Sequence, residues 1–201
     1  MKIRKKKAVE QYSPIPYLTA VLNCAFWVLY GLPFVHPNSL LVVTINGTGL
    51  ILELIYLALF FIYSSNELKM KVLKVLISEL ASIAVIAVMV LTTTHTHNKR
   101  TLIVGVLCIV FSICLYVSPL SVMKLVIETK SVKYMPFWLS LTSFLNGLCW
   151  TFYALIKFDI FILIPNGLGA VLGFLQLLLY SWYCRCTPTE DPEEKQHEIS
   201  A

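Results

Sequence analysis

Long apolar stretches alternate with short polar connections along most of the chain. Most of these stretches reach the roughly 20 residues that a helix needs to cross the hydrocarbon core of a bilayer. The connections are only a few residues long, which favours antiparallel neighbouring helices. The pattern predicts six membrane-spanning helices, at about 15–35, 40–63, 72–94, 101–126, 136–156 and 160–183.

Composition points to the same class of protein. Hydrophobic residues make up 58% of the chain and charged residues 13%, with a mean hydropathy of +0.77. Soluble domains are about half apolar and a quarter charged. We therefore expect an all-α polytopic membrane protein, with the lipid bilayer as its surroundings. The net charge of +5 lies in loops and an N-terminal cluster, so no nucleic-acid partner is expected.

The distribution of basic residues predicts the orientation. Of the 16 Lys and Arg residues, all but Lys99, Arg100 and Lys157 fall on the side that carries the N-terminus. Because positive loops stay in the cytosol, both termini are predicted to be cytosolic. The polar segment 185–201 is expected to be a disordered cytosolic tail.

Three features of the sequence occur twice. They are Pro16 and Pro136, the Asn-Gly-x-Gly motifs at 46–49 and 166–169, and an Asn-x-x-x-Trp-x-x-Tyr motif at 23–30 and 146–153. The first two pairs are 120 residues apart and the third is 123 apart, which a small insertion reconciles. Ordered motifs at one spacing indicate an internal duplication.

The duplication predicts two three-helix repeats joined by a linker helix. The predicted parts are 1–63, the first repeat without its first helix; 64–100, the linker helix and loops; 101–184, the second repeat; and 185–201, the tail. Pro119 lies 17 residues before Pro136, so its counterpart would precede Met1. We therefore expect the first helix of the first repeat to be absent, which leaves six.

Polar and aromatic residues inside the apolar stretches are the candidates for binding. Asn46 and Asn166 begin glycine-containing stretches, and their amides suit sugar hydroxyls, although each could instead bond a neighbouring helix. Trp27 and Trp150 could stack on a sugar ring or anchor their helices at the interface.

One turn before each tryptophan lies a second asparagine. Asn23 and Asn146 share a helix face with Trp27 and Trp150 by their spacing of four residues. They could narrow a pocket and bond a hydroxyl, or they could pack in the core.

Hinge and gate residues are also predicted. Pro16, Pro119 and Pro136 could bend spanning helices, although Pro16 and Pro136 could be ordinary helix caps. Asp159 could close an outer gate against Tyr30 or Tyr153, or be a solvated loop acid.

No paired carboxylates, nucleophile with a base, or phosphate-binding loop appears in the sequence, so an enzyme is not expected. No metal site and no cofactor are predicted. Glu53, a lone acid in an apolar stretch, leaves proton coupling as a further hypothesis beside a structural hydrogen bond.

At these motifs the sequence resembles the SWEET, or MtN3/saliva, sugar transporters of plants. The matching stretches are SPIPYLTAVLNCAFWVLYGLP at 13–33, TINGTG at 44–49, YVSPLSVMKLVIETKSVKYMPF at 116–137, LNGLCWTFYAL at 145–155 and IPNGLG at 164–169. The resemblance implies facilitated, bidirectional sugar movement by alternating access, without ion coupling.

On the matching positions, the resemblance implies a role for each candidate. Asn46, Asn166, Trp27 and Trp150 would hold the sugar. Asn23 and Asn146 would set selectivity, with asparagine expected in hexose carriers and serine in sucrose carriers, and Pro16, Pro119 and Pro136 would be hinges.

The resemblance further implies a glucose-like hexose rather than sucrose, a plasma-membrane location, and a homo-oligomer or a hetero-oligomer with other SWEET proteins. Family members have seven helices. A truncated form that does not transport, but binds full-length relatives and modulates them, is therefore the alternative hypothesis.

Overall fold

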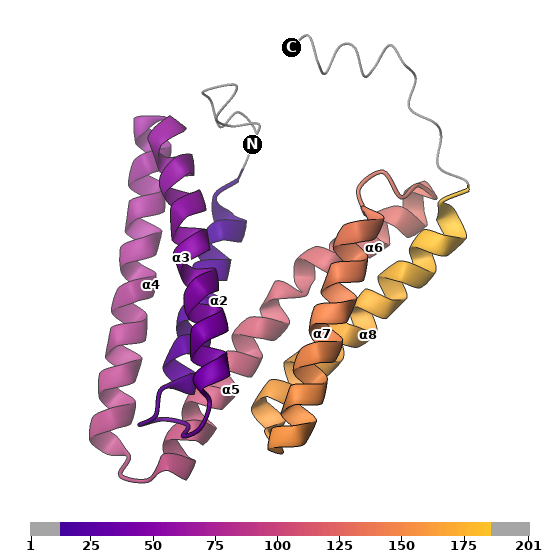
Figure 1. Ribbon diagram of the computed structural model, residues 1–201. Coiled ribbons are helices and arrows are strands. Elements are labelled where there is room, and N and C mark those ends of the chain that lie inside the picture. Colours follow the sequence, from indigo (N-terminus) through magenta and orange to yellow (C-terminus); the bar gives the residue numbers. More distant parts are fainter. Residues whose placement is uncertain (1–12, 186–201) are drawn as a thin grey trace. The chain divides into compact units, whose positions relative to one another are not determined.

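The computed structural model describes residues 13–185, and all regular structure in that range is helical (Figure 1). The helices are α2 (Ile15–Gly31), α3 (Leu40–Tyr63), α4 (Asn66–Thr93), α5 (His97–Leu115), α6 (Val117–Thr129), α7 (Phe137–Lys157) and α8 (Ile160–Tyr183). This confirms the predicted all-α class. The predictions for the acidic tail and for the N-terminal basic cluster fall outside the described residues.

Five of the six predicted membrane spans are confirmed as candidate spans, and the sixth is a shorter helix. Five helical stretches are long and apolar enough to cross a bilayer: α3, α4, α7, α8 and the 33 residues of His97–Thr129, which combine α5 and α6. The sixth, α2, is apolar but has 17 residues. That length is at the lower limit for a spanning helix.

Two helices begin earlier than their apolar pattern indicates. The helix α4 starts at Asn66 rather than near residue 72, because Ser65 caps it by accepting a hydrogen bond from the amide of Leu68. The helix α5 starts at His97, within the segment expected to be a loop. Polar first turns carry no hydrophobic signal, so a pattern based on apolar residues misses them.

The described residues divide into two compact units, 13–112 and 113–185. In the first unit, α2 packs along α3 and also against α4. A cluster of buried side chains joins these three helices near the start of α2. It consists of Leu18, Leu57, Phe60 and Val72.

Arg100 connects the loops at the other end of the first unit. Its guanidinium donates hydrogen bonds to the carbonyls of Thr94 and Leu91, at the end of α4, and to that of Phe34. A cation at a helix C-terminus satisfies carbonyls that have no partner within the helix. The side chain is therefore a structural cap as well as one of the three basic residues counted on the outer side.

The second unit contains α6, α7 and α8, and α7 and α8 run side by side (Figure 1). Their backbones approach closely at two glycines. A Cβ atom on Gly147 would lie 2.7 Å from the backbone nitrogen of Ala170, and one on Gly173 would lie 2.8 Å from the Cα of Phe144. Small residues at such points let membrane helices pack tightly.

The stretch from α5 to α6 is interrupted at Tyr116, three residues before Pro119. Proline lacks the amide hydrogen and its ring crowds the carbonyl four residues earlier, here that of Leu115. The interruption therefore follows from the proline. It lies close to the division between the two units, which falls after Ser112.

Candidate functional site

The two Asn-Gly-x-Gly motifs have the same local geometry. Asn46 donates its side-chain amide to the carbonyl of Val42 at 2.9 Å, and Asn166 donates to that of Ile162 at 2.8 Å. Both side chains are half-buried. Each amide group therefore points in the same direction relative to its helix, and each keeps a second N–H and a carbonyl oxygen that can bond a ligand.

The following glycines leave space beside these amides. A Cβ atom on Gly47 or Gly167 would meet no side chain and no backbone of another element within 4 Å. An open position next to a half-buried amide suits close approach of a polar ligand to the helix.

The two tryptophan motifs also repeat their geometry. Trp27 and Tyr30 meet edge to face with ring centres 5.5 Å apart and an interplanar angle of 76°, and Trp150 and Tyr153 do so at 5.5 Å and 86°. Two motifs with the same sequence spacing thus form the same aromatic pair.

The surroundings of these pairs differ. Trp27 is 7% exposed, and its indole N–H donates to the hydroxyl of Ser112 at 3.1 Å. The Ser112 hydroxyl in turn donates to the side-chain oxygen of Asn23 at 3.0 Å. One serine of α5 therefore ties both candidates on α2 together, and the Trp27 N–H already has a structural partner.

The corresponding residues of the second motif are more accessible. Asn146 is exposed and Trp150 is half-buried. Within residues 13–185, neither side chain makes a hydrogen bond of the kind that joins Asn23 and Trp27 to Ser112. Their polar groups are therefore available to a ligand.

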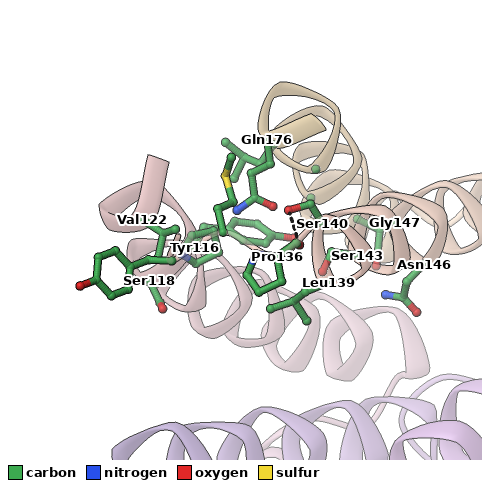
Figure 2. A pocket seen from close by; sticks show the side chains of 17 residues that line it. Tyr116, Ser118, Val122, Pro136, Leu139, Ser140, Ser143, Asn146, Gly147 and Gln176 are labelled. Atoms are coloured by element: carbon green, nitrogen blue, oxygen red, sulfur yellow. Dashed lines mark hydrogen bonds between the residues drawn. The ribbon is translucent and has the colours of Figure 1, made fainter. Parts of the chain in front are cut away.

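A cavity of about 350 Å³ lies within the second unit (Figure 2). Asn146 of α7 and Asn166 of α8 both line it, whereas Trp150 does not. Its other polar side chains come from α6, α7, α8 and the loops beside them. They are Tyr116, Ser118, Tyr134, Ser140, Ser143 and Gln176. The volume is within the range of small-molecule sites, and the mixture of hydroxyls, amides and apolar walls suits an uncharged polar ligand.

Several of these residues were not predicted from the sequence. The hydroxyl of Tyr116 donates to the carbonyl of Pro165 at 2.5 Å, and a Cβ atom on Gly169 would lie 2.6 Å from the same hydroxyl oxygen. Gln176 lies on α8, ten residues after Asn166, and lines the cavity. It is an isolated amide in an apolar stretch, and that pattern in the sequence could have identified it as a candidate.

The three predicted hinge prolines lie at helix starts. Pro16 is in the first turn of α2, Pro136 is the N-cap residue of α7, and Pro119 is in the first turn of α6 directly after the interruption. Pro16 and Pro136 therefore lie where prolines commonly begin helices, as the alternative prediction of ordinary helix caps expects. Pro119 and Pro136 also line the cavity of the second unit.

Asp159 is not a solvated loop acid. It is 6% exposed and caps α8, where its Oδ1 atom accepts hydrogen bonds from the amides of Phe161 at 3.0 Å and Ile162 at 3.2 Å. Tyr30 is fully buried and its ring stacks on His36, with centres 4.9 Å apart. Tyr153 is half-buried, so the two predicted gate tyrosines have different environments.

Apolar spanning helices, a duplicated set of amides and aromatic rings, and a polar cavity among the helices define a class. This is a membrane transport protein for small polar molecules.

Comparisons with known proteins narrow the class to a family. The model of the MtN3_slv family, described as sugar efflux transporters for intercellular exchange, matches residues 1–68 and 102–188. The chain therefore belongs to this family of sugar transporters, as the resemblance implied.

Curated relatives and a solved structure agree. The chain is 57% identical over 189 residues to the bidirectional sugar transporter SWEET4 of Arabidopsis thaliana, covering 94% of the chain and 75% of the relative. It is 54% identical over 187 residues to SWEET4 of Oryza sativa subsp. indica, covering 93% and 72%. A 3.7 Å structure of a eukaryotic SWEET transporter matches with a TM-score of 0.88 and 37% identity, over 92% of the chain and 86% of that structure.

Proposed function

We propose that the chain is a bidirectional, facilitative carrier for glucose-like hexoses that works by alternating access. The observation that carries the proposal is the duplicated asparagine, Asn46 and Asn166, which keeps the same hydrogen bond and the same half-buried position in both repeats. Relatives named bidirectional sugar transporters support the substrate class.

The proposed chemistry is hydrogen bonding to hydroxyls together with contact to the apolar face of the sugar ring. Asn46 and Asn166 offer a donor and an acceptor each. Trp27 and Trp150 are the proposed stacking partners, of which half-buried Trp150 offers both a ring face and an N–H in this structure. Asn23 and Asn146 lie one turn away and limit the size of the sugar that fits.

Alternating access requires a place where a spanning segment bends. The interruption at Tyr116, followed by Pro119, supplies one between α5 and α6. In this proposal Pro16 and Pro136 are further bending points at helix starts. Asp159, Tyr30 and Tyr153 belong to the outer gate, where Asp159 also fixes the start of α8.

The proposed location is the plasma membrane with both termini in the cytosol. The support is the asymmetry of basic residues, of which all but three of 16 lie on one side. Assembly into homo- or hetero-oligomers remains a prediction.

The test is uptake of labelled glucose and labelled sucrose by cells that lack hexose carriers, together with efflux from preloaded cells. We expect glucose to move in both directions and independently of pH, and sucrose to move poorly. The variant Asn23→Ser with Asn146→Ser should shift the ratio toward sucrose by widening the pocket.

A matched control is Ser82→Ala, an exposed position on α4 away from all candidate residues. It should transport as the unchanged chain does. Surface-expressed protein that moves neither sugar would contradict the proposal, and transport that collapses a proton gradient would contradict the facilitative mechanism.

A further inference from the structure

An apolar groove in the first unit has no role in the proposed transport. It lies between the last turns of α3 and the first turns of α4, and its volume is about 380 Å³. All eight side chains that line it are apolar, and they include Ala58, Phe61, Ile62, Val72 and Leu73. Ile62 is 62% exposed and Leu73 is 39% exposed, so the groove opens to the surroundings of the helices.

A cation lies at the end of this groove. The ammonium of Lys69 is 5.9 Å from the ring centre of Phe61, which lines the groove. Within residues 13–185, the ammonium of Lys69 forms no ion pair with an acidic side chain, in contrast to that of Lys124, which pairs with Glu128. A positive charge beside an apolar groove is complementary to an amphiphile with an anionic head.

The surrounding turns strengthen the positive potential. The first turns of α4 carry Lys69, Lys71 and Lys74 against a single acid, Glu67. These turns follow the short connection after α3, on the side that the basic residues predict to be cytosolic. Anionic lipids concentrate in that leaflet, and each Lys near the surface attracts them.

The dimensions of the groove suit a hydrocarbon chain. Its lining on α3 extends from Leu54 to Ile62, a rise of about 12 Å at 1.5 Å per residue. A water takes about 30 Å³ of liquid and a methylene group is of similar size, so the volume holds on the order of a dozen such groups.

We propose that this groove binds an anionic phospholipid, with one acyl chain between α3 and α4 and its phosphate at Lys69. The site is independent of the proposed sugar transport, and its test does not measure transport. Lipid bound here would bridge the two helices where they make few direct contacts outside the cluster around Phe60.

The test is native mass spectrometry of the full chain, purified and titrated with phosphatidylglycerol or with phosphatidylcholine of the same acyl chains. We expect phosphatidylglycerol to be retained preferentially. Lys69→Glu should weaken its retention by about fivefold or more, the effect of losing one lysine at a membrane surface. Ala58→Phe should fill the groove and reduce retention of both lipids.

Two control variants match these changes. Lys74→Glu makes the same charge change on the same helix, but five residues on it points about 140° away from Lys69. Ala81→Phe adds the same ring at an exposed position of α4 outside the groove. Both should retain phosphatidylglycerol nearly as the unchanged chain does.

Equal losses in Lys69→Glu and Lys74→Glu would overturn the proposal, because the attraction would then be a general surface effect. Unchanged retention in Ala58→Phe would show that no chain occupies the groove. Dimers that Ala58→Phe disrupts, without preferential lipid retention, would assign the groove to a second copy instead.

Discussion

The two copies of the Asn-x-x-x-Trp-x-x-Tyr motif lie in different surroundings. In the first repeat, Asn23 and Trp27 are held by Ser112, and Trp27 and Tyr30 are buried. In the second repeat, Asn146 is exposed and lines a cavity, and Trp150 is half-buried.

A repeated motif therefore does not guarantee a repeated role. The asparagines of the Asn-Gly-x-Gly motifs, Asn46 and Asn166, keep equivalent hydrogen bonds, whereas the Asn-x-x-x-Trp motifs do not. Ligand binding most directly explains Asn46 and Asn166, whose hydrogen bonds are the same in both motifs. Asn23 and Trp27 also serve packing, because their bonds to Ser112 have no counterpart at Asn146 and Trp150.

The largest effect expected from a single substitution is at the close approach of α7 and α8. Gly147→Ala should lower the free energy of unfolding by about 2 kcal/mol, because the new Cβ would lie 2.7 Å from the backbone of Ala170 and overpacking of a tight interface costs about 1–3 kcal/mol. Thermal unfolding of the purified chain measures it.

The control is Gly167→Ala on the neighbouring helix, where a Cβ atom meets nothing within 4 Å. Alanine favours helix over glycine by about 1 kcal/mol, so this variant should be unchanged or more stable. Equal destabilisation by both substitutions would show that α7 and α8 are not packed at Gly147 as described.

The next largest effect separates the two tryptophans. Trp27→Phe removes the N–H that bonds buried Ser112 and should lower the free energy of unfolding by about 1.5 kcal/mol. Trp150→Phe, at the half-buried counterpart, should leave stability within about 0.5 kcal/mol. Thermal unfolding of the two variants side by side measures this difference in stability. Equal losses of stability would contradict the conclusion that Trp27 has a structural role that Trp150 lacks.

A smaller effect is expected at the start of α8. Asp159→Ala removes the cap that accepts from Phe161 and Ile162 and should cost about 1 kcal/mol. Asp159→Ser retains a capping oxygen and should recover most of that stability. If transport falls in Asp159→Ser while stability is restored, Asp159 acts at the gate as well as in the cap.

Much of the fold follows from the sequence because the bilayer leaves few choices. Apolar length alone located α3 and α8 with the observed bounds, since every backbone polar group must be paired within a spanning helix. The polar first turns of α4 and α5 do not appear in the apolar pattern, because polar residues carry no hydrophobic signal and the capping bond of Ser65 at the start of α4 is not recorded by it.

Two residues that line the cavity of the second unit belong to motifs that occur twice in the sequence. Asn146 and Asn166 were predicted from duplication and line one cavity. Tyr116 and Ser112 were not, because neither belongs to a repeated motif and their roles depend on contacts with Pro165 and Trp27 that are distant in the sequence.

The most direct measurement is glucose uptake by Asn46→Ala, Asn166→Ala and the double variant, each normalised to the amount at the cell surface. If both asparagines bond the same sugar, each single variant should lose about tenfold or more, equivalent to about 1.4 kcal/mol, and the double variant should be no better than either. Uptake that is lost in Asn166→Ala but unchanged in Asn46→Ala would contradict this account, because only one repeat would then hold the sugar.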